Sequence, residues 1–274
     1  MNQDNVANLT KVFCVVNQKG GVGKTTTAIN LAAVLAMSGK RVLLIDLDPQ
    51  GNATMGSGID KNEIKENLYQ VLIGASTIAD VRVRSEVGGY DVLPANRELS
   101  GAEIDLIQMD ERELQLKQAI ALVLDDYDFI LIDCPPALSL LTLNGLTSAH
   151  GVIIPMQCEY FALEGLSDLV NTVKRVHRNM NPELRLIGLL RVMFDTRVTL
   201  QQQVSAQLET HFGDKVFKTV VPRNVRLAEA PSYGMPGTIY DKNSRGAKAY
   251  IAFGAELLTR VKKETLRARA EIPE

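Results

Sequence analysis

Short runs of hydrophobic residues alternate along the chain with longer stretches in which hydrophobic residues recur at helical spacing. Several short runs are hydrophobic along almost their whole length, which is typical of strands buried on both faces of a parallel sheet. The short runs predict β-strands at residues 12–17, 41–46, 90–95, 129–133, 151–155, 186–194 and 215–221.

The longer stretches predict helices at residues 25–38, 97–125, 138–149, 161–179, 198–212 and 246–268. Alternation of strands and helices favours an α/β fold, with a doubly wound, mostly parallel sheet and helices on both faces. The sequence has no internal repeat and no linker rich in Pro, Gly or Ser. We therefore expect one domain at 11–274, preceded by a disordered segment at 1–10.

Composition narrows the class of protein. The chain has 274 residues, of which 46% are hydrophobic and 23% charged, as in ordinary globular proteins. No hydrophobic run approaches the roughly 20 residues that span a bilayer, and the polar start does not resemble a signal peptide. Cys14, Cys134 and Cys158 form no CxxC pair. We therefore expect a cytoplasmic protein without a disulfide framework, an iron–sulfur cluster or a membrane partner.

The charge is unevenly distributed. Residues 171–274 hold 18 Lys and Arg against 10 Asp and Glu, whereas the rest of the chain holds 12 against 22. A basic C-terminal third allows contact with a polyanion although the net charge is −2. An ordinary solvated surface explains the same counts, so charge alone does not decide between the two.

A glycine-rich turn, NQKGGVGKTT at 17–26, follows the first predicted strand and opens the first predicted helix. Such a turn lets backbone N–H groups converge on phosphate oxygens, while a lysine reaches the terminal phosphates and a threonine hydroxyl binds Mg²⁺. Gln18 stands where the standard P-loop pattern has Gly, so the motif is the variant KGGxGK[ST]. The candidate phosphate-binding residues are Lys19, Gly20, Gly21, Val22, Gly23, Lys24, Thr25 and Thr26.

Three aspartates end two further predicted strands. Asp46 and Asp48 follow one strand and Asp133 ends another, so all three should meet at the carboxyl edge of the sheet beside the glycine-rich turn. Asp133, with Thr25, would hold Mg²⁺ as a Walker B aspartate does. Asp48 would contribute to the metal site and orient the attacking water, and Asp46 could instead anchor a lysine.

The stretches KGGVGKTT, LLIDLDPQGN, ILIDCPP, QCEYFALEG and PRNVRLAEAPSYG together resemble the ParA/Soj family of partitioning ATPases. This family belongs to the MinD/ParA class with a deviant Walker A motif, and the resemblance runs from about residue 11 to about 262. It implies ATP and Mg²⁺ as cofactors and an ATP-dependent homodimer. It also implies that Lys19 reaches the partner's phosphates, although a solvated loop lysine is the simpler alternative. Lys19, Lys24 and Asp48 are then the catalytic candidates for slow hydrolysis.

The resemblance also suggests a base pocket and a DNA surface. In relatives the segment with Pro222, Arg223 and Asn224 borders the adenine. Met193 or Asp195 could join it, although core packing explains Met193 equally well. Non-specific binding of double-stranded DNA is implied for Arg197 and Arg226. Four nearby basic residues are further candidates, although an ordinary surface position or a salt bridge explains them better: Arg223, Lys242, Arg245 and Lys248.

From the whole sequence we expect an ATP-dependent, nucleoid-associated switch that acts in chromosome or plasmid segregation. By resemblance, a ParB-type centromere-binding partner stimulates its ATPase. One alternative is a MinD-like membrane ATPase that positions cell-division machinery, which would need an amphipathic C-terminal helix lying on lipid. Another is a metabolic P-loop enzyme such as a synthetase, for which the sequence offers no substrate-pocket signal.

Overall fold

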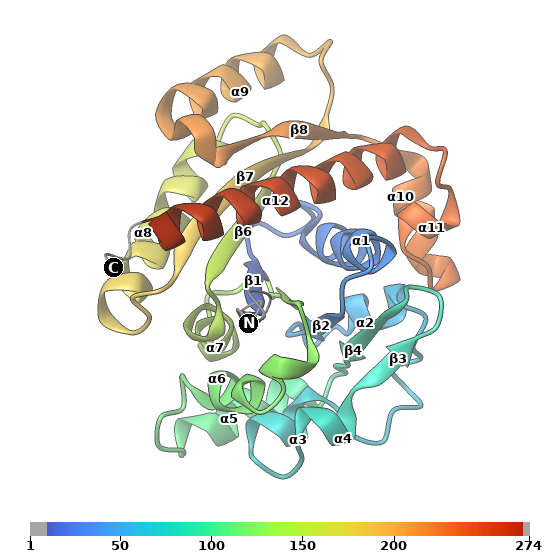
Figure 1. Cartoon of the computed structure of the whole chain (residues 1–274), viewed down its shortest axis with the longest axis vertical. Helices are drawn as coiled ribbons and strands as arrows, with labels where there is room; N and C mark the ends of the chain where they lie inside the picture. The colour runs from blue at the N-terminus through green and yellow to red at the C-terminus, as the bar shows by residue number, and fades with distance from the viewer. Residues whose placement is uncertain (1–9, 271–274) are drawn as a thin grey trace, which may run out of the picture.

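The computed structural model describes residues 10–270, which contain one eight-stranded sheet with the order β3-β4-β2-β5-β1-β6-β7-β8 (Figure 1). Every neighbouring pair is parallel except β3 and β4. The strands are β1 Lys11–Val15, β2 Val42–Asp46, β3 Val83–Ser85, β4 Tyr90–Leu93, β5 Phe129–Asp133, β6 Gly151–Met156, β7 Arg185–Phe194 and β8 Val216–Pro222. The predicted fold class, a mostly parallel α/β sheet, is confirmed.

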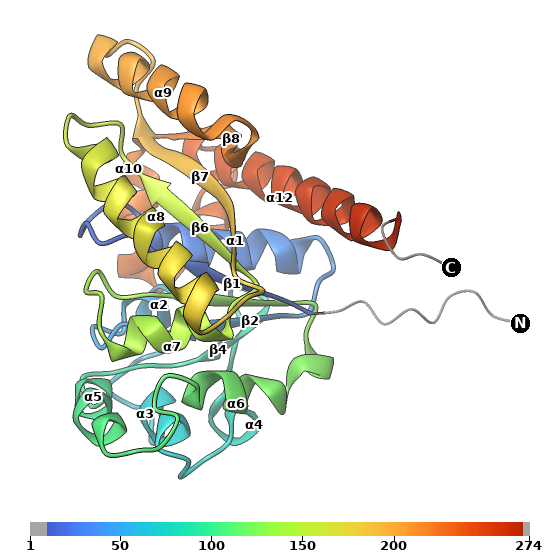
Figure 2. The same cartoon turned by 90° about the vertical axis from the view of Figure 1, so that its left-hand side faces the viewer.

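Helices cover both faces of this sheet. Helix α12 crosses one face together with α1 (Figure 1), and α7 and α8 lie on the other (Figure 2). The helices are α1 Lys24–Met37, α2 Asn52–Gly56, α3 Leu68–Leu72, α4 Ile78–Val81, α5 Leu99–Ile107, α6 Gln115–Ala121, α7 Leu140–Ser148, α8 Ala162–Asn179, α9 Thr199–Phe212, α10 Val225–Glu229, α11 Gly237–Tyr240 and α12 Arg245–Ala270. Single 3₁₀ turns are η1 Leu124–Asp126, η2 Gly213–Lys215 and η3 Ala230–Tyr233.

The sheet separates two hydrophobic cores. Along β1, Phe13 and Val15 enter the core under α1 and α12, while Val12 and Cys14 enter the core under α7 and α8. Successive side chains of a strand point to opposite faces, so a strand with a core on each side must be hydrophobic at every position. This two-sided burial explains the almost unbroken hydrophobic runs of the sequence.

The predicted helix at 97–125 is wrong as a single element. It is divided into α5, α6 and the turn η1, because Glu111 takes a positive φ of 50° in the polar segment between α5 and α6. The prediction that 1–10 is disordered lies outside the described residues except at Thr10. Its hydroxyl oxygen lies 2.6 and 2.7 Å from the backbone oxygens of Leu124 and Tyr127, which share its one hydrogen.

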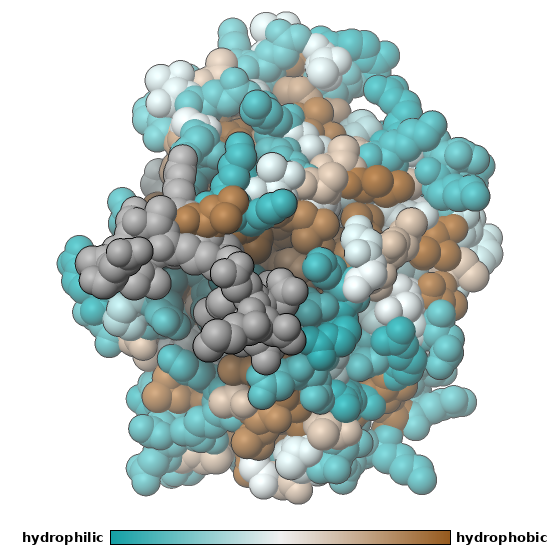
Figure 3. Space-filling model, viewed as in Figure 1, coloured by the Kyte–Doolittle hydropathy of each residue, from teal (hydrophilic) through white to brown (hydrophobic). Residues whose placement is uncertain are grey.

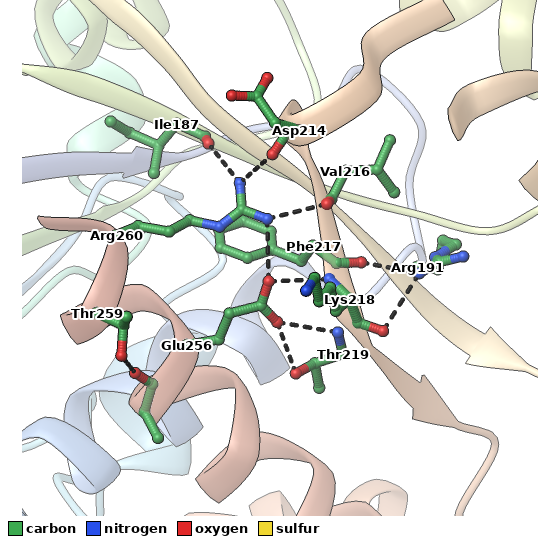
Figure 4. A network of polar contacts seen from close by, with 11 residues as sticks. Ile187, Arg191, Asp214, Val216, Phe217, Lys218, Thr219, Glu256, Thr259 and Arg260 are labelled. Atoms are coloured by element: carbon green, nitrogen blue, oxygen red, sulfur yellow. Dashed lines mark hydrogen bonds and ion pairs between the residues drawn. The ribbon is translucent and has the colours of Figure 1, made fainter. Parts of the chain in front are cut away.

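A network of hydrogen bonds connects side chains of helix α12 to the backbone of the edge strand β8 (Figure 4). The Glu256 carboxylate accepts hydrogen bonds from the backbone N–H groups of Lys218 and Thr219, each at 2.9 Å. Arg260 donates to Glu256 and to the backbone oxygen of Val216, each at 2.9 Å, and its guanidinium stacks over the ring of Phe217. The register between β7 and β8 is irregular here, so these side chains replace part of the strand ladder.

Most of the hydrophobic side of α12 is covered, although Leu266 is 53% exposed. Tyr250, Phe253 and Leu257 are buried in the core that α12 shares with α1. On the molecular surface seen in the orientation of Figure 1, hydrophobic residues form separate areas among hydrophilic ones (Figure 3). Within residues 10–270, no helix has the length and hydrophobicity to cross a membrane.

Candidate nucleotide and magnesium site

The turn between β1 and α1, residues 17–23, forms what we call the phosphate loop. Gly21 and Gly23 have φ values of 72° and 79°, in the left-handed region that favours glycine. No side chain of the described residues caps α1, so its first backbone N–H groups are available to an anion. A β-carbon on Gly20 or Gly21 would meet no atom within 4 Å, so the space above the loop is open.

Lys24 lies inside this loop. It is 7% exposed, and its ammonium Nζ is 3.4 Å from the backbone oxygen of Lys19. Burial lowers the pKa of Lys24, although the charges of Asp133 and Asp48 act in the opposite direction. The structure therefore brings this predicted cation and two of the predicted carboxylates to one place, where an ammonium can bind phosphate oxygens.

Asp133, at the end of β5, is the most unusual carboxylate of the described residues. It is fully buried, and neither of its oxygens has a hydrogen-bond partner of good geometry within 10–270. Burial raises the pKa of Asp133 well above its ordinary value, and the neighbouring Asp46 raises it further; Thr25 and Lys24 oppose the shift. A buried carboxylate without partners is costly unless a ligand compensates for it.

Mg²⁺ fits this carboxylate. The described residues contain no cluster of three or more His, Cys, Asp or Glu side chains that could hold a metal alone. Mg²⁺ is commonly held by one or two carboxylates together with waters and substrate phosphates, so a complete protein cage is unnecessary. Asp133 and the neighbouring Thr25 hydroxyl offer such a partial set beside the phosphate loop.

The other two aspartates differ from one another. Asp46 is fully buried and accepts hydrogen bonds from the N–H and hydroxyl of Thr54, each at 2.8 Å. It therefore anchors α2 and not a lysine, which corrects the prediction. Burial raises the pKa of Asp46 to about 7. Asp48 is half-buried and accepts a hydrogen bond from the N–H of Gln50 at 2.9 Å, so it stands at the site with one oxygen engaged in its own turn.

Lys19 forms an ion pair with Glu159, which lies between β6 and α8. The two side chains are 54% and 48% exposed. Lys19 is thus an exposed loop lysine, but it is not simply solvated, because it has a defined partner within its own chain. Glu159 was not predicted as that partner, although it lies in the quoted motif QCEYFALEG.

Met193 and Phe194, the last two residues of β7, have different surroundings. Phe194 is buried in the core, whereas Met193 is half-buried and lies near Gly23, where an added β-carbon would be 3.9 Å from its methyl group. Gln157 was not predicted, but its side-chain nitrogen is 2.8 Å from the Met193 sulfur. Met193 therefore borders the phosphate loop.

The end of β8 and the residues after it lie beside the end of β7. Pro222 pairs with Phe194 in the sheet, and Arg223 is exposed. The side-chain oxygen of Asn224 accepts a hydrogen bond from the N–H of Leu227 at 3.3 Å and caps α10. The candidate base residues thus share one edge of the sheet with the phosphate loop.

The predicted DNA-binding residues lie at neighbouring loops, but the two arginines are paired. Arg197, 86% exposed, bonds Asp195 at 2.7 Å, and its hydrogen bonds lower the pKa of that aspartate, with a smaller contribution from Arg245. Arg226 bonds Glu229 at 2.8 Å. Arg245 and Lys248 begin α12, which packs closely on the segment at 224–227.

A cavity of about 410 Å³ adjoins the phosphate loop on the α2 side. No sequence signal predicted it, because its walls come from three separate segments. Its lining residues are Thr25, Thr26, Ile29, Asn52, Met55, Pro231 and Ser232.

Comparison with known proteins adds independent information. A sequence profile for a family described as an AAA domain matches residues 10–186. A crystal structure of cobyrinic acid a,c-diamide synthase from Mycobacterium smegmatis, with bound ATP analogue and magnesium, is similar in fold. Its TM-score is 0.82 at 39% identity, over 93% of this chain and 96% of that one.

Two relatives are more similar in sequence. The sporulation initiation inhibitor protein Soj of Bacillus subtilis is 51% identical over 247 residues, which are 90% of this chain and 98% of Soj. The chromosome partitioning protein ParA of Caulobacter vibrioides is 46% identical over 264 residues, which are 96% of this chain and 99% of ParA. Since both matches extend over nearly the whole of each protein, the chain belongs to the ParA/Soj family of chromosome-partitioning ATPases.

Proposed function

We propose that this partition ATPase is a dimerising switch that binds DNA without sequence preference and releases it after hydrolysis. Its cofactors are ATP and Mg²⁺. The observation that carries the proposal is Asp133, a fully buried carboxylate beside Lys24 that has no hydrogen-bond partner of good geometry within residues 10–270. Such a group is best explained as part of a site completed by Mg²⁺ and a nucleotide.

Each residue of the site has a role in this proposal. The phosphate loop and Lys24 bind the phosphates, and Thr25 and Asp133 hold Mg²⁺. The metal, when bound, neutralises charge on the terminal phosphates. Asp48, the more accessible carboxylate, positions the attacking water and supports the metal site. Met193 and the segment 222–224 border the base.

The switch requires two copies of the chain. Lys19 exchanges Glu159 for the terminal phosphate held by the other copy, which makes association depend on ATP. DNA contacts come from Arg197, Arg226, Arg245 and Lys248. A ParB-type partner stimulates hydrolysis, and the protein acts in the cytoplasm on the nucleoid.

Light scattering after size exclusion, with and without ATP and Mg²⁺, tests the switch. Electrophoretic shift of double-stranded DNA at several salt concentrations follows on the same samples. We expect dimers and salt-sensitive DNA binding only with ATP. A protein that remains monomeric with bound ATP, or DNA affinity independent of nucleotide, would contradict the proposal. Sedimentation with liposomes separates it from the MinD-like alternative, which is disfavoured by the burial of Tyr250, Phe253 and Leu257 of α12 in the core.

A further inference from the structure

Two aromatic rings are exposed next to the Lys19–Glu159 pair. Tyr160 and Phe161 follow Glu159 directly, and each is 74% exposed. Their ring centroids are 5.0 Å apart in an edge-to-face arrangement. We call these two residues the aromatic patch. Single exposed hydrophobic residues are normal, whereas two large exposed rings in contact form a small apolar surface that another molecule can cover.

The aromatic patch is attached to the phosphate loop. Just before it, the Glu159 carboxylate pairs with Lys19. The side-chain nitrogen of Gln157 is 3.4 Å from the backbone oxygen of Gly21. After it, α8 begins, and the Gly165 N–H bonds the backbone oxygen of Phe161 at 3.3 Å. The rings thus lie next to the nucleotide site.

The charges around the aromatic patch indicate what can cover it. Lys19 and Glu159 supply one positive and one negative side chain, both about half exposed, and Glu164 adds another acid in the first turn of α8. A polyanion such as DNA would meet these acids and is disfavoured. A surface with both signs of charge around an apolar centre is self-complementary, as a two-fold interface requires.

We infer that the aromatic patch is the apolar centre of the interface between two copies of this chain. This inference rests on the proposed function. In that proposal Lys19 reaches the nucleotide of the other copy, and it can do so only if the second copy packs against the surface around Lys19. The open space over Gly20 and Gly21 allows that close approach. Lys19 and Glu159 can then exchange their pairing for partners in the second copy.

The test compares the double variant Tyr160→Ala/Phe161→Ala with wild type and with Leu122→Ala. Leu122, 75% exposed after α6, is a matched exposed hydrophobic residue away from the phosphate loop. Dimer dissociation constants are measured by sedimentation with Mg²⁺ and a non-hydrolysable ATP analogue. We expect about a tenfold or larger increase for the double variant only. Nucleotide affinity of the monomer and the unfolding temperature should match wild type.

Each result gives a clear decision. If wild type stays monomeric with the analogue, the proposed function fails and this inference fails with it. If wild type dimerises and the double variant dimerises equally well, the inference alone is overturned. In that case, loss of partner-stimulated hydrolysis or of liposome binding in the variant would assign the aromatic patch to a different occupant.

Discussion

At the residue scale, Lys24 and Asp133 are each subject to two opposing effects, burial and the charge of the other. Burial disfavours the charged form of each, and each favours the charged form of the other. Within the described residues neither oxygen of Asp133 has a hydrogen-bond partner of good geometry, and the nearby Thr25 hydroxyl offsets only part of the effect of burial. A ligand that supplies both a cation and phosphates would satisfy the two groups together, so its binding should also stabilise the fold.

Lys24→Ala should abolish nucleotide binding, because the phosphate loop loses the cation at its centre. It can be measured as the rise of the unfolding temperature with ATP and Mg²⁺, expected for wild type and absent in the variant. Lys40→Ala, beyond the end of α1, is the control and should respond as wild type does. An unchanged rise in Lys24→Ala would remove this lysine from the site.

Asp48→Ala should retain ATP but hydrolyse it at least about a hundredfold more slowly, because a positioned group that handles the attacking water contributes roughly that much. Phosphate release measures turnover, and light scattering should show dimers that persist after ATP addition. Normal turnover would mean that another group positions the water.

The sequence predicted these positions because they depend on local chemistry. A strand, a glycine turn and a helix bring Lys24 and Thr25 to the carboxyl edge, and Asp133 ends an adjacent strand. Partners from distant segments were not predictable. Glu159 lies 140 residues from Lys19 and Gln157 lies 36 residues from Met193, and no spacing rule connects either pair.

At the element scale, long periodic segments were predicted well and short ones were missed. Helices α1, α7, α8, α9 and α12 agree with their predicted ranges to within a few residues. Strand β3 and helices α2 and α10 have only three to five residues, which is too short for periodicity to appear. Strand β8 was predicted, but not its dependence on α12.

Glu256→Ala should lower the free energy of unfolding by roughly 1–3 kcal/mol, because two backbone N–H groups of β8 lose their acceptor. Glu264→Ala, exposed on the same helix, is the matched control and should change it by less than about 0.5 kcal/mol. Urea denaturation gives both values. Equal losses in the two variants would show that the network contributes little.

At the scale of the whole molecule, uneven charge and chain topology act together. Strand β1 lies between β5 and β6 and is parallel to both. The loops that follow these central strands therefore lie at the same edge of the sheet. The loop with Arg197, the helix with Arg226 and the start of α12 come from the basic C-terminal third. The sequence predicted this excess of positive charge, but not that carboxylates already engage both arginines.

These ion pairs lead to a prediction about DNA. Exposed ion pairs are weak, so DNA phosphates can take Arg197 and Arg226 from Asp195 and Glu229 at little cost. Arg197→Glu with Arg226→Glu should leave ATP-dependent dimerisation intact and weaken binding of double-stranded DNA at least about tenfold at moderate salt. The slope of log affinity against log salt should fall by roughly two, because about two phosphate contacts are lost.

The control for this prediction is Arg175→Glu with Arg178→Glu, which makes the same change in net charge on exposed positions of α8. Because α8 covers the opposite face of the sheet from α12, its variant should keep most of the DNA affinity. If both double variants lose affinity equally, the effect reflects overall charge and not a defined surface. If only the α8 variant loses it, the DNA surface lies on the face that carries α7 and α8.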